Sequence, residues 1–171
     1  MFRLPNSKRI EADNIYREAL EAYRKQNINE AILQMDEAVR LLPDMSEYIA
    51  TRGFFRLEDG DEERAREDFE RALGHYAYET LANYGLGVLA YREKDWATAF
   101  EFFKRAWAVS PQRPEILYYM ALLYHRMGDN HNAHLRMGQA QVFFDANEQG
   151  KLSKQAQKWL QQFETILKRQ A

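Results

Sequence analysis

The chain has 171 residues, and its 24 lysines and arginines are balanced by 26 aspartates and glutamates, which gives a formal net charge of −2. This balance argues against a general nucleic-acid binder, because such proteins carry a basic excess that displaces counterions from phosphates. Aromatic residues make up 13% of the chain, too many for a disordered segment, and the absence of cysteine excludes disulfides and thiolate zinc sites.

The first residues, MFRLPNSKRIEAD, contain no apolar stretch of signal-peptide length. No later segment reaches the run of about 18 apolar residues that would suggest a membrane-spanning helix. From these two observations we expect a cytoplasmic protein with no membrane insertion. Residues 1–11 are predicted to form an N-terminal extension in which the first helix begins.

From residue 12 onwards the sequence repeats at intervals of 34 residues without insertions. In every copy two alanines bracket a large apolar residue, and a proline closes the first and third copies. Such self-similarity is typical of stacked repeat proteins, and it predicts repeats at 12–45, 46–79, 80–113 and 114–147. The recurring residues are Ala31, Met35, Ala38 and Pro43; Ala65, Phe69, Ala72 and Ala77; Ala99, Phe103, Ala106 and Pro111; and Ala133, Met137, Ala140 and Asp145.

Each copy is predicted to contain two helices joined by a tight turn near the fifteenth and sixteenth places. Asp61, Asp95 and Asp129 stand just before the second helices of their copies. They are well placed as N-caps, because a carboxylate there accepts hydrogen bonds from the unpaired N–H groups of the first turn. A small residue at the eighth place lets the two helices approach closely, and it is Ala19, Gly53, Gly87 or Ala121.

This combination of period, paired alanines and small eighth residue resembles the tetratricopeptide repeat (TPR) family over roughly residues 12–147. Glu18 and Arg52 depart from it, because the family usually carries leucine at their place. The resemblance implies an all-α fold, a right-handed solenoid of four helix-turn-helix repeats. The third copy matches best, with Leu86, Gly87, Ala99, Phe103, Ala106 and Pro111.

The segment 148–171 is predicted to hold one further, amphipathic helix. Gln155 stands where a repeat would carry its small residue, so the segment is not a fifth repeat. We interpret it as a capping helix over the last helix pair, and the alternative is a helix that docks on another subunit. Its apolar stripe comprises Leu152, Ala156, Trp159, Leu160, Phe163, Ile166 and Leu167.

The aromatic run ATAFEFFKRAWAVSP at 97–111 is interpreted as part of the packing of the array, not as a cofactor site. Phe103 and Trp107 are predicted to lie in the core or between repeats. For Phe100 and Phe102, packing and partial exposure both remain open, as does a dimer patch that would make the chain a homodimer.

No phosphate-binding glycine loop, nucleophile elbow or zinc-protease motif occurs in the sequence. His125, His131 and His134 come nearest to a metal site, but His125 belongs to the other helix of its pair, so we predict surface histidines. The charged run DGDEERAREDFER at 59–71, in which Arg64 and Asp68 are i,i+4 neighbours, is predicted to form a solvated helix face. We therefore expect no enzyme, no metal and no cofactor.

The resemblance further implies that the first helices of successive repeats line a concave groove. Arg24, Arg92 and Arg126 would follow one edge of it, where they suit carboxylates on a ligand. The alternative is that some lining residues pack within the array, or that a terminal segment fills the groove. The predicted lining consists of Tyr16, Leu20, Tyr23, Arg24, Phe54, Tyr84, Val88, Tyr91, Arg92, Tyr118, Tyr119, Leu122, His125 and Arg126.

Tyrosine and arginine are common anchors of protein interfaces, so this lining suits a partly apolar peptide or amphipathic helix of a partner protein. Some family members hold acidic chaperone tails with a clamp of lysines, asparagines and an arginine, and Tyr16, Leu20, Thr51, Leu81 and Gly85 stand at those places instead. We predict a protein-binding scaffold or adaptor. The alternative is a client-specific chaperone resembling the small TPR chaperones of bacterial secretion systems.

Overall fold

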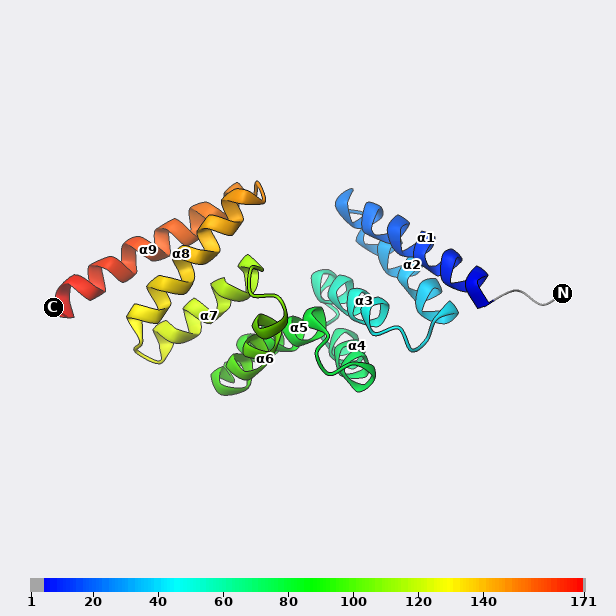
Figure 1. Ribbon diagram of the computed structural model, residues 1–171, viewed down its shortest axis with the longest axis horizontal. Helices are drawn as coiled ribbons and strands as arrows, with labels where there is room; N and C mark the ends of the chain where they lie inside the picture. Colours follow the sequence, from blue (N-terminus) through cyan, green and yellow to red (C-terminus); the bar gives the residue numbers. More distant parts are fainter. Residues whose placement is uncertain (1–4, 171) are drawn as a thin grey trace. The chain divides into compact units, whose positions relative to one another are not determined.

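The computed structural model describes residues 5–170, and throughout this range the regular structure is helical (Figure 1). The chain forms two compact units, called here the N-terminal unit (up to Glu93) and the C-terminal unit (from Lys94). The helices of the described range are α1 (Pro5–Arg24), α2 (Ile28–Leu41), α3 (Ser46–Asp59), α4 (Glu62–His75), α5 (Thr80–Arg92), α6 (Trp96–Val109), α7 (Pro114–Arg126), α8 (Asn130–Ala146) and α9 (Gly150–Gln170).

The 34-residue interval of the sequence recurs in the helices themselves. The second helices of the four pairs begin at Ile28, Glu62, Trp96 and Asn130. In the N-terminal unit α1 packs on α2 and α3 packs on α4, and in the C-terminal unit α8 lies between α7 and α9 (Figure 1). The prediction of an all-α fold is confirmed.

The recurring small and large apolar residues form the core of both units. Close packing is possible because alanine at two places leaves room for the larger side chain between them. In the N-terminal unit the large residue Phe69 sits against two glycines of neighbouring helices. A Cβ added to Gly85 would lie 2.2 Å from the Phe69 ring, so this contact admits no side chain. The fully buried recurring residues are Ala31, Met35, Ala38, Ala65, Phe69, Ala72, Ala99, Phe103, Ala106, Ala133, Met137 and Ala140.

The three predicted N-caps are confirmed. The carboxylates of Asp61, Asp95 and Asp129 each accept a hydrogen bond from the backbone N–H three residues on, at 3.2, 3.1 and 3.0 Å. Hydrogen bonds from the side chain and backbone of Thr98 lower the pKa of Asp95, and those of Asn132 do the same for the pKa of Asp129. The caps fix where α4, α6 and α8 begin.

The turn inside each helix pair places one residue in the left-handed region of backbone conformation. The φ angles are 64° at Gln26, 90° at Gly60, 64° at Lys94 and 81° at Gly128. Glycine adopts this conformation readily, whereas an L side chain is strained there. Two of the four turns therefore carry strain that the other two avoid.

A buried ion cluster joins α2, α3 and α4 in the N-terminal unit. Arg52 donates two hydrogen bonds to Asp68, at 2.6 and 3.0 Å, and one to Asp36 at 2.8 Å. Arg56 bonds to the same two carboxylates, at 2.9 and 3.0 Å. Burial opposes the charge of Arg52, but the hydrogen bonds and charges of Asp68 and Asp36 outweigh it and raise the Arg52 pKa.

This ion cluster corrects one prediction and explains a departure from the family pattern. Asp68 was expected on a solvated face, yet it is only 3% exposed, because its carboxylate is turned inward to the two arginines. Arg52 occupies the place of the family's leucine, and its guanidinium is held between Asp68 and Asp36.

Helix α9 covers α8 of its own chain, which confirms the predicted cap. Ser153, Ala156 and Phe163 are its buried residues. Just before α9, the Gln149 side chain donates to the Glu115 carboxylate at 3.1 Å and so connects the cap to the start of α7.

The aromatic run of α6 contributes mainly to packing inside the C-terminal unit. Phe103 is fully buried, and its ring stacks on Tyr119 with centroids 5.0 Å apart. Trp107 is half-buried beneath the Arg136 guanidinium. Phe100 and Phe102 are half-buried as well, and Phe100 meets the edge of Tyr124.

Candidate partner-binding face

Most of the predicted lining residues of the N-terminal unit lie on α1 and α3. Aromatic side chains of these two helices contact one another at two places. Tyr16 of α1 stacks on Tyr48 of α3, with ring centroids 5.0 Å apart. Further along both helices, the Tyr23 ring stacks on Phe55 and meets the edge of the Phe54 ring, with centroid distances of 4.8 and 5.7 Å. The contact order is the same on both helices, since Tyr16 precedes Tyr23 and Tyr48 precedes Phe55, so the two helices run parallel.

A half-exposed apolar strip lies along this pair of helices. Tyr16, Leu20 and Tyr23 are half-buried on α1, and Phe54 is half-buried on α3. Tyr48 and Phe55, by contrast, are buried beneath them. The outer rings thus rest on a rigid inner layer and keep part of their surface available for contact. We call these four half-buried residues, together with Glu47 and Glu58 at the two ends of the strip, the α1–α3 face.

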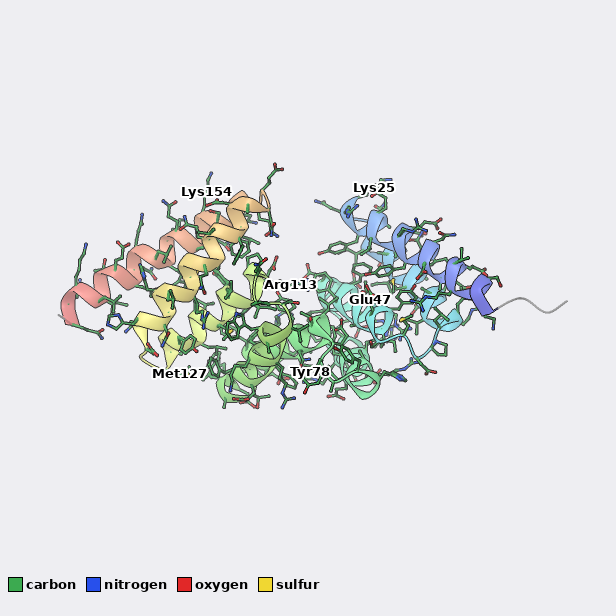
Figure 2. All side chains as sticks on the ribbon, in the orientation of Figure 1. Lys25, Glu47, Tyr78, Arg113, Met127 and Lys154 are labelled. Atoms are coloured by element: carbon green, nitrogen blue, oxygen red, sulfur yellow. The ribbon has the colours of Figure 1, made fainter. Side chains whose placement is uncertain are left out.

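Carboxylates stand at both ends of the α1–α3 face. The Tyr16 hydroxyl donates to the Glu47 carboxylate at 3.3 Å, and Glu47, labelled in Figure 2, lies in the first turn of α3. Burial raises the pKa of Tyr16, and the charges of Glu47 and Glu79 add to this effect, while a hydrogen bond with Thr51 opposes it. Burial and the neighbouring Glu58 carboxylate raise the pKa of Tyr23. Both tyrosines stay neutral donors at physiological pH.

Helix α5 supplies four further predicted residues, and the structure separates them. Tyr84 and Tyr91 are half-buried. Val88 is only 3% exposed, so it supports the helix from within and offers no surface. Arg92 is exposed and bonds the Glu62 carboxylate of α4 at 2.6 Å.

In the C-terminal unit, the equivalent tyrosine place is contacted by the capping helix. The indole N–H of Trp159 donates to the Tyr118 hydroxyl at 3.1 Å. The His125 ring packs against Trp159 and Phe163, with centroids 6.0 and 5.1 Å away. His125 Nδ1 also lies 2.7 Å from Asn130 Oδ1, a contact that requires the proton on Nδ1 because an amide oxygen only accepts.

The remaining predicted residues of α7 are also held by their own unit. Tyr119 stacks on the buried Phe103, and Leu122 is 8% exposed. Arg126 lies over the Trp96 ring at 4.0 Å, a cation–π contact. Part of the alternative reading therefore holds here, since these side chains pack within the array.

The predicted arginine edge is engaged in internal contacts. Arg24 forms an ion pair with Glu21 at 3.6 Å, Arg92 bonds Glu62, and Arg126 covers an indole. Glu47 and Glu58 were not among the predicted lining residues. Both lie on α3, the first helix of the second repeat, and the resemblance implies that such helices line the groove, so the signal was present.

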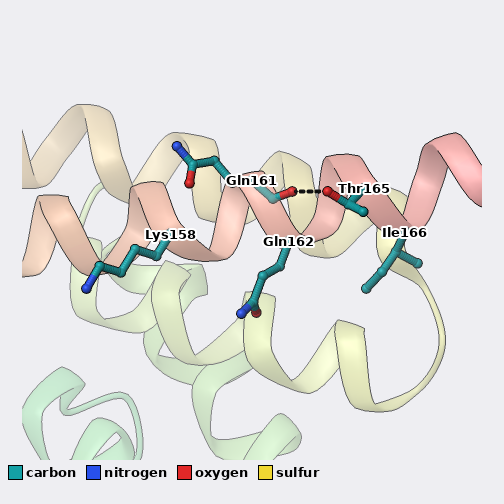
Figure 3. A pocket seen from close by; sticks show the side chains of 5 residues that line it. All are labelled: Lys158, Gln161, Gln162, Thr165 and Ile166. Atoms are coloured by element: carbon teal, nitrogen blue, oxygen red, sulfur yellow. Dashed lines mark hydrogen bonds between the residues drawn. The ribbon is translucent and has the colours of Figure 1, made fainter.

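Other surface features offer less. Helix α9 carries a shallow hollow lined by Lys158, Gln161, Gln162, Thr165 and Ile166, beside which the Thr165 hydroxyl donates to the Gln161 backbone carbonyl (Figure 3). Across residues 5–170, no three histidine, aspartate or glutamate side chains are arranged to hold a metal ion. Over the same range, the helices lack the length and apolar character that crossing a bilayer requires.

Comparison with known proteins identifies the class of fold. No family model matches the sequence. The chain superposes on TTC0263, a TPR protein of Thermus thermophilus, with a TM-score of 0.70 and 17% identity over 91% of this chain and 82% of that one. The chain therefore has the fold of the TPR proteins, and the resemblance read from its sequence is confirmed at the level of the fold.

The chain is also similar to two further proteins. The type III secretion chaperone SycD of Yersinia enterocolitica, solved with a peptide of the translocator YopD, has a TM-score of 0.61 and 17% identity, covering 70% of this chain and 92% of SycD. The probable biofilm formation methyltransferase WspC of Pseudomonas putida is 35% identical over 78 residues, which is 45% of this chain. The match spans 18% of WspC, less than a fifth of that protein.

Proposed function

We propose that this chain is a protein-interaction module that binds a partly apolar peptide or helix of a partner protein on the first helices of its repeats. One observation carries the proposal: Tyr16, Leu20, Tyr23 and Phe54 form a half-exposed apolar strip that rests on buried rings. Tyrosine and phenylalanine on a rigid base bury area at low entropic cost.

The energetics favour a modest affinity. A flexible peptide loses conformational freedom when it is ordered on a surface, and this loss offsets much of the gain from apolar burial. We expect dissociation constants on the order of micromolar for an isolated peptide. A partner with a preformed helix binds more tightly, because it has less freedom to lose.

A displayed library of random peptides, selected on the immobilised chain, tests this proposal. The enriched peptides are then titrated by calorimetry against the wild type and against a Leu20→Ala/Phe54→Ala variant. Neither side chain is fully buried, so the fold should be retained, which circular dichroism verifies. We expect binding to weaken at least about tenfold, the effect of removing an interface anchor.

A matched control removes apolar surface elsewhere. Leu33 on α2 and Val142 on α8 are each 64% exposed, so a Leu33→Ala/Val142→Ala variant loses two exposed apolar side chains outside the α1–α3 face. The control should bind the peptides like the wild type. If the control loses binding while the Leu20/Phe54 variant keeps it, the site lies elsewhere and the proposal fails.

A second candidate, a client-specific chaperone, is favoured by the similarity to SycD, which was solved with a translocator peptide. The two roles differ in what happens to the partner. An adaptor binds a protein that is soluble by itself, whereas a chaperone keeps an otherwise insoluble client in solution. Co-expression with the partner, followed by measurement of its soluble fraction, separates them. From WspC we carry over no activity.

A further inference from the structure

We infer that the α1–α3 face selects a positively charged partner segment, one in which arginine or lysine flanks the apolar anchors. This inference rests on the proposed function and specifies the chemistry of the ligand. It reverses the polarity suggested by the sequence, where arginines of the groove were expected to meet carboxylates of the ligand.

The first observation is a pair of tyrosine–carboxylate neighbours at the two ends of the apolar strip. Glu47 accepts from the Tyr16 hydroxyl at one end, and Glu58 is the carboxylate neighbour of Tyr23 at the other. Both glutamates are exposed, so a ligand can reach them. Leu20 and Phe54 lie between the two ends.

The second observation concerns where the neighbouring cations are directed. Arg17 donates to Asn14 and to the Asp13 carbonyl, while Arg24 at the end of α1 and Lys25 just after it both pair with Glu21 of α1. The two arginines of α3 point to the buried ion cluster with Asp36 and Asp68. Within residues 5–170, neither Glu47 nor Glu58 forms an ion pair with a lysine or arginine.

The same side also carries other acidic groups. The Asp13 carboxylate accepts from the buried Tyr48 hydroxyl, and Glu79 caps α5 while its charge acts on Tyr16. The positive charge of Arg9 acts in the opposite direction, since it lowers the pKa of Tyr48, but it is the least of the effects on that group. The field over the α1–α3 face is therefore negative, and a cationic segment complements it.

A tyrosine beside a carboxylate is well suited to a guanidinium. The ring face attracts the cation, and the carboxylate accepts two parallel hydrogen bonds from it. The tyrosines are seven residues apart on one helix, about 10 Å, and the glutamates eleven apart, about 16 Å. This spacing matches basic residues two to three helical turns apart in a bound helix.

Repeat-equivalent positions show that the fold itself does not require these carboxylates. The places of Glu47 and Glu58 hold Leu81 and Arg92 in the third repeat, and Glu115 and Arg126 in the fourth. The Glu115 carboxylate already accepts a hydrogen bond from Gln149, and it lies 3.8 Å from the Arg113 guanidinium. The acidic pair thus belongs to the N-terminal unit alone, among the described residues of these three repeats.

Three labelled model peptides test the inference directly. Each is a helix of about 15 residues with the same leucine stripe, and the polar positions two to three turns apart carry arginine, glutamine or glutamate. Fluorescence anisotropy against the wild-type chain should rank them arginine, glutamine, glutamate. We expect the arginine peptide to bind about tenfold tighter than the glutamine peptide, with the difference shrinking as salt is raised.

Paired variants identify the source of the preference. In Glu47→Gln/Glu58→Gln the arginine and glutamine peptides should bind alike. Glu67 and Glu70 are exposed on α4, so Glu67→Gln/Glu70→Gln changes the net charge equally and should keep the preference. If both double variants lose the preference equally, the effect is general net charge and the inference is wrong.

The outcomes separate this inference from the proposed function. If the three peptides bind equally well and Leu20→Ala/Phe54→Ala still abolishes binding, the proposed function stands and the charge selection is refuted. Tighter binding of the glutamate peptide, or self-association of the chain that the peptides displace, assigns the face to an acidic partner or to a second copy. If no peptide binds, both fail for this face.

Discussion

The N-terminal and C-terminal units are built from the same repeat but use the first helices differently. In the N-terminal unit, Tyr16 and Tyr23 rest on buried rings and face carboxylates at the surface. In the C-terminal unit, Tyr118 receives a hydrogen bond from the capping helix, and Tyr119 stacks into the core. A tyrosine at a given repeat place therefore has no fixed role, because its neighbours decide what it does.

The units also differ in what holds their helices together. Besides the ring stacking between α1 and α3, the N-terminal unit has an ion cluster between α2, α3 and α4. In the C-terminal unit, aromatic and cation–π contacts join α6, α7, α8 and α9. The three tryptophans, Trp96, Trp107 and Trp159, all belong to the C-terminal unit. Their fluorescence therefore reports on that unit, while far-ultraviolet circular dichroism reports on both.

The largest expected effect comes from breaking the ion cluster. Asp68→Ala leaves Arg52 and Arg56 buried with half of their partners, so the N-terminal unit should lose about 3–5 kcal/mol of unfolding free energy. Urea denaturation followed by circular dichroism measures the loss. Asp36→Ala is the control and should cost less, because 43% of the Asp36 side chain is exposed. Equal losses in the two variants would contradict the assignment of Asp68 as the buried partner.

A second change tests the tight packing of the N-terminal unit. In Gly85→Ala the new methyl group meets the Phe69 ring, and we expect a loss of about 1–3 kcal/mol, as for other overpacked cores. Gly74→Ala on α4 is the matched control, because nothing lies within 4 Å of its added Cβ. Phe69→Met, which copies the first and fourth repeats, should rescue part of the stability in the Gly85→Ala background. Thermal melting compares the variants, and a harmless Gly85→Ala would overturn the close approach.

A third change removes the link between the cap and the tyrosine of the C-terminal unit. Trp159→Phe keeps an aromatic ring but loses the N–H donor to Tyr118, which should cost about 1 kcal/mol. The same variant should bind the arginine peptide like the wild type, because the α1–α3 face is untouched. A large loss of peptide binding would instead place Trp159 in the binding site. The proposed difference between the two units would then be wrong.

The last expected effect, no larger than that of Trp159→Phe, is a gain in stability, and it should be similar in both units. Gln26→Gly and Lys94→Gly relieve a left-handed residue in equivalent turns, each worth about 1 kcal/mol. Gly60→Ala and Gly128→Ala should lose a comparable amount. Denaturation midpoints measure the four variants. A gain at only one of the two turns would show that the turns differ in more than their backbone angles.

Much of the fold could be predicted from the sequence because the repeats are visible as residues that recur at a fixed interval. Alanine at two places and a larger residue between them recur at a fixed interval, and the structure buries all of them. The caps Asp61, Asp95 and Asp129 follow from local chemistry, since a carboxylate just before a helix accepts hydrogen bonds from the unpaired N–H groups of the first turn. Asp68 could not be placed this way, because its partners come from other helices and its own helix surface reads as charged and solvated.

The candidate face was predictable only in part. The resemblance points to the correct helices, and Tyr16, Leu20, Tyr23 and Phe54 do offer half-exposed surface. The sequence gives no sign that Val88 and Leu122 turn inward, or that Arg24, Arg92 and Arg126 are engaged by neighbours. Which partner a long arginine side chain finds depends on groups brought close by folding, and a list of repeat places does not contain them.

By itself, then, the sequence determined the helices, their pairing and the TPR-type core, because these depend on local periodicity and on residues of matched size. Only the tertiary structure decided the charge of the exposed face and the fate of each tyrosine. The physical reason is that electrostatics and side-chain contacts act between residues far apart in the chain. Glu58 meets Tyr23, Asp68 meets Arg52, and Trp159 meets Tyr118 only after the helices have packed.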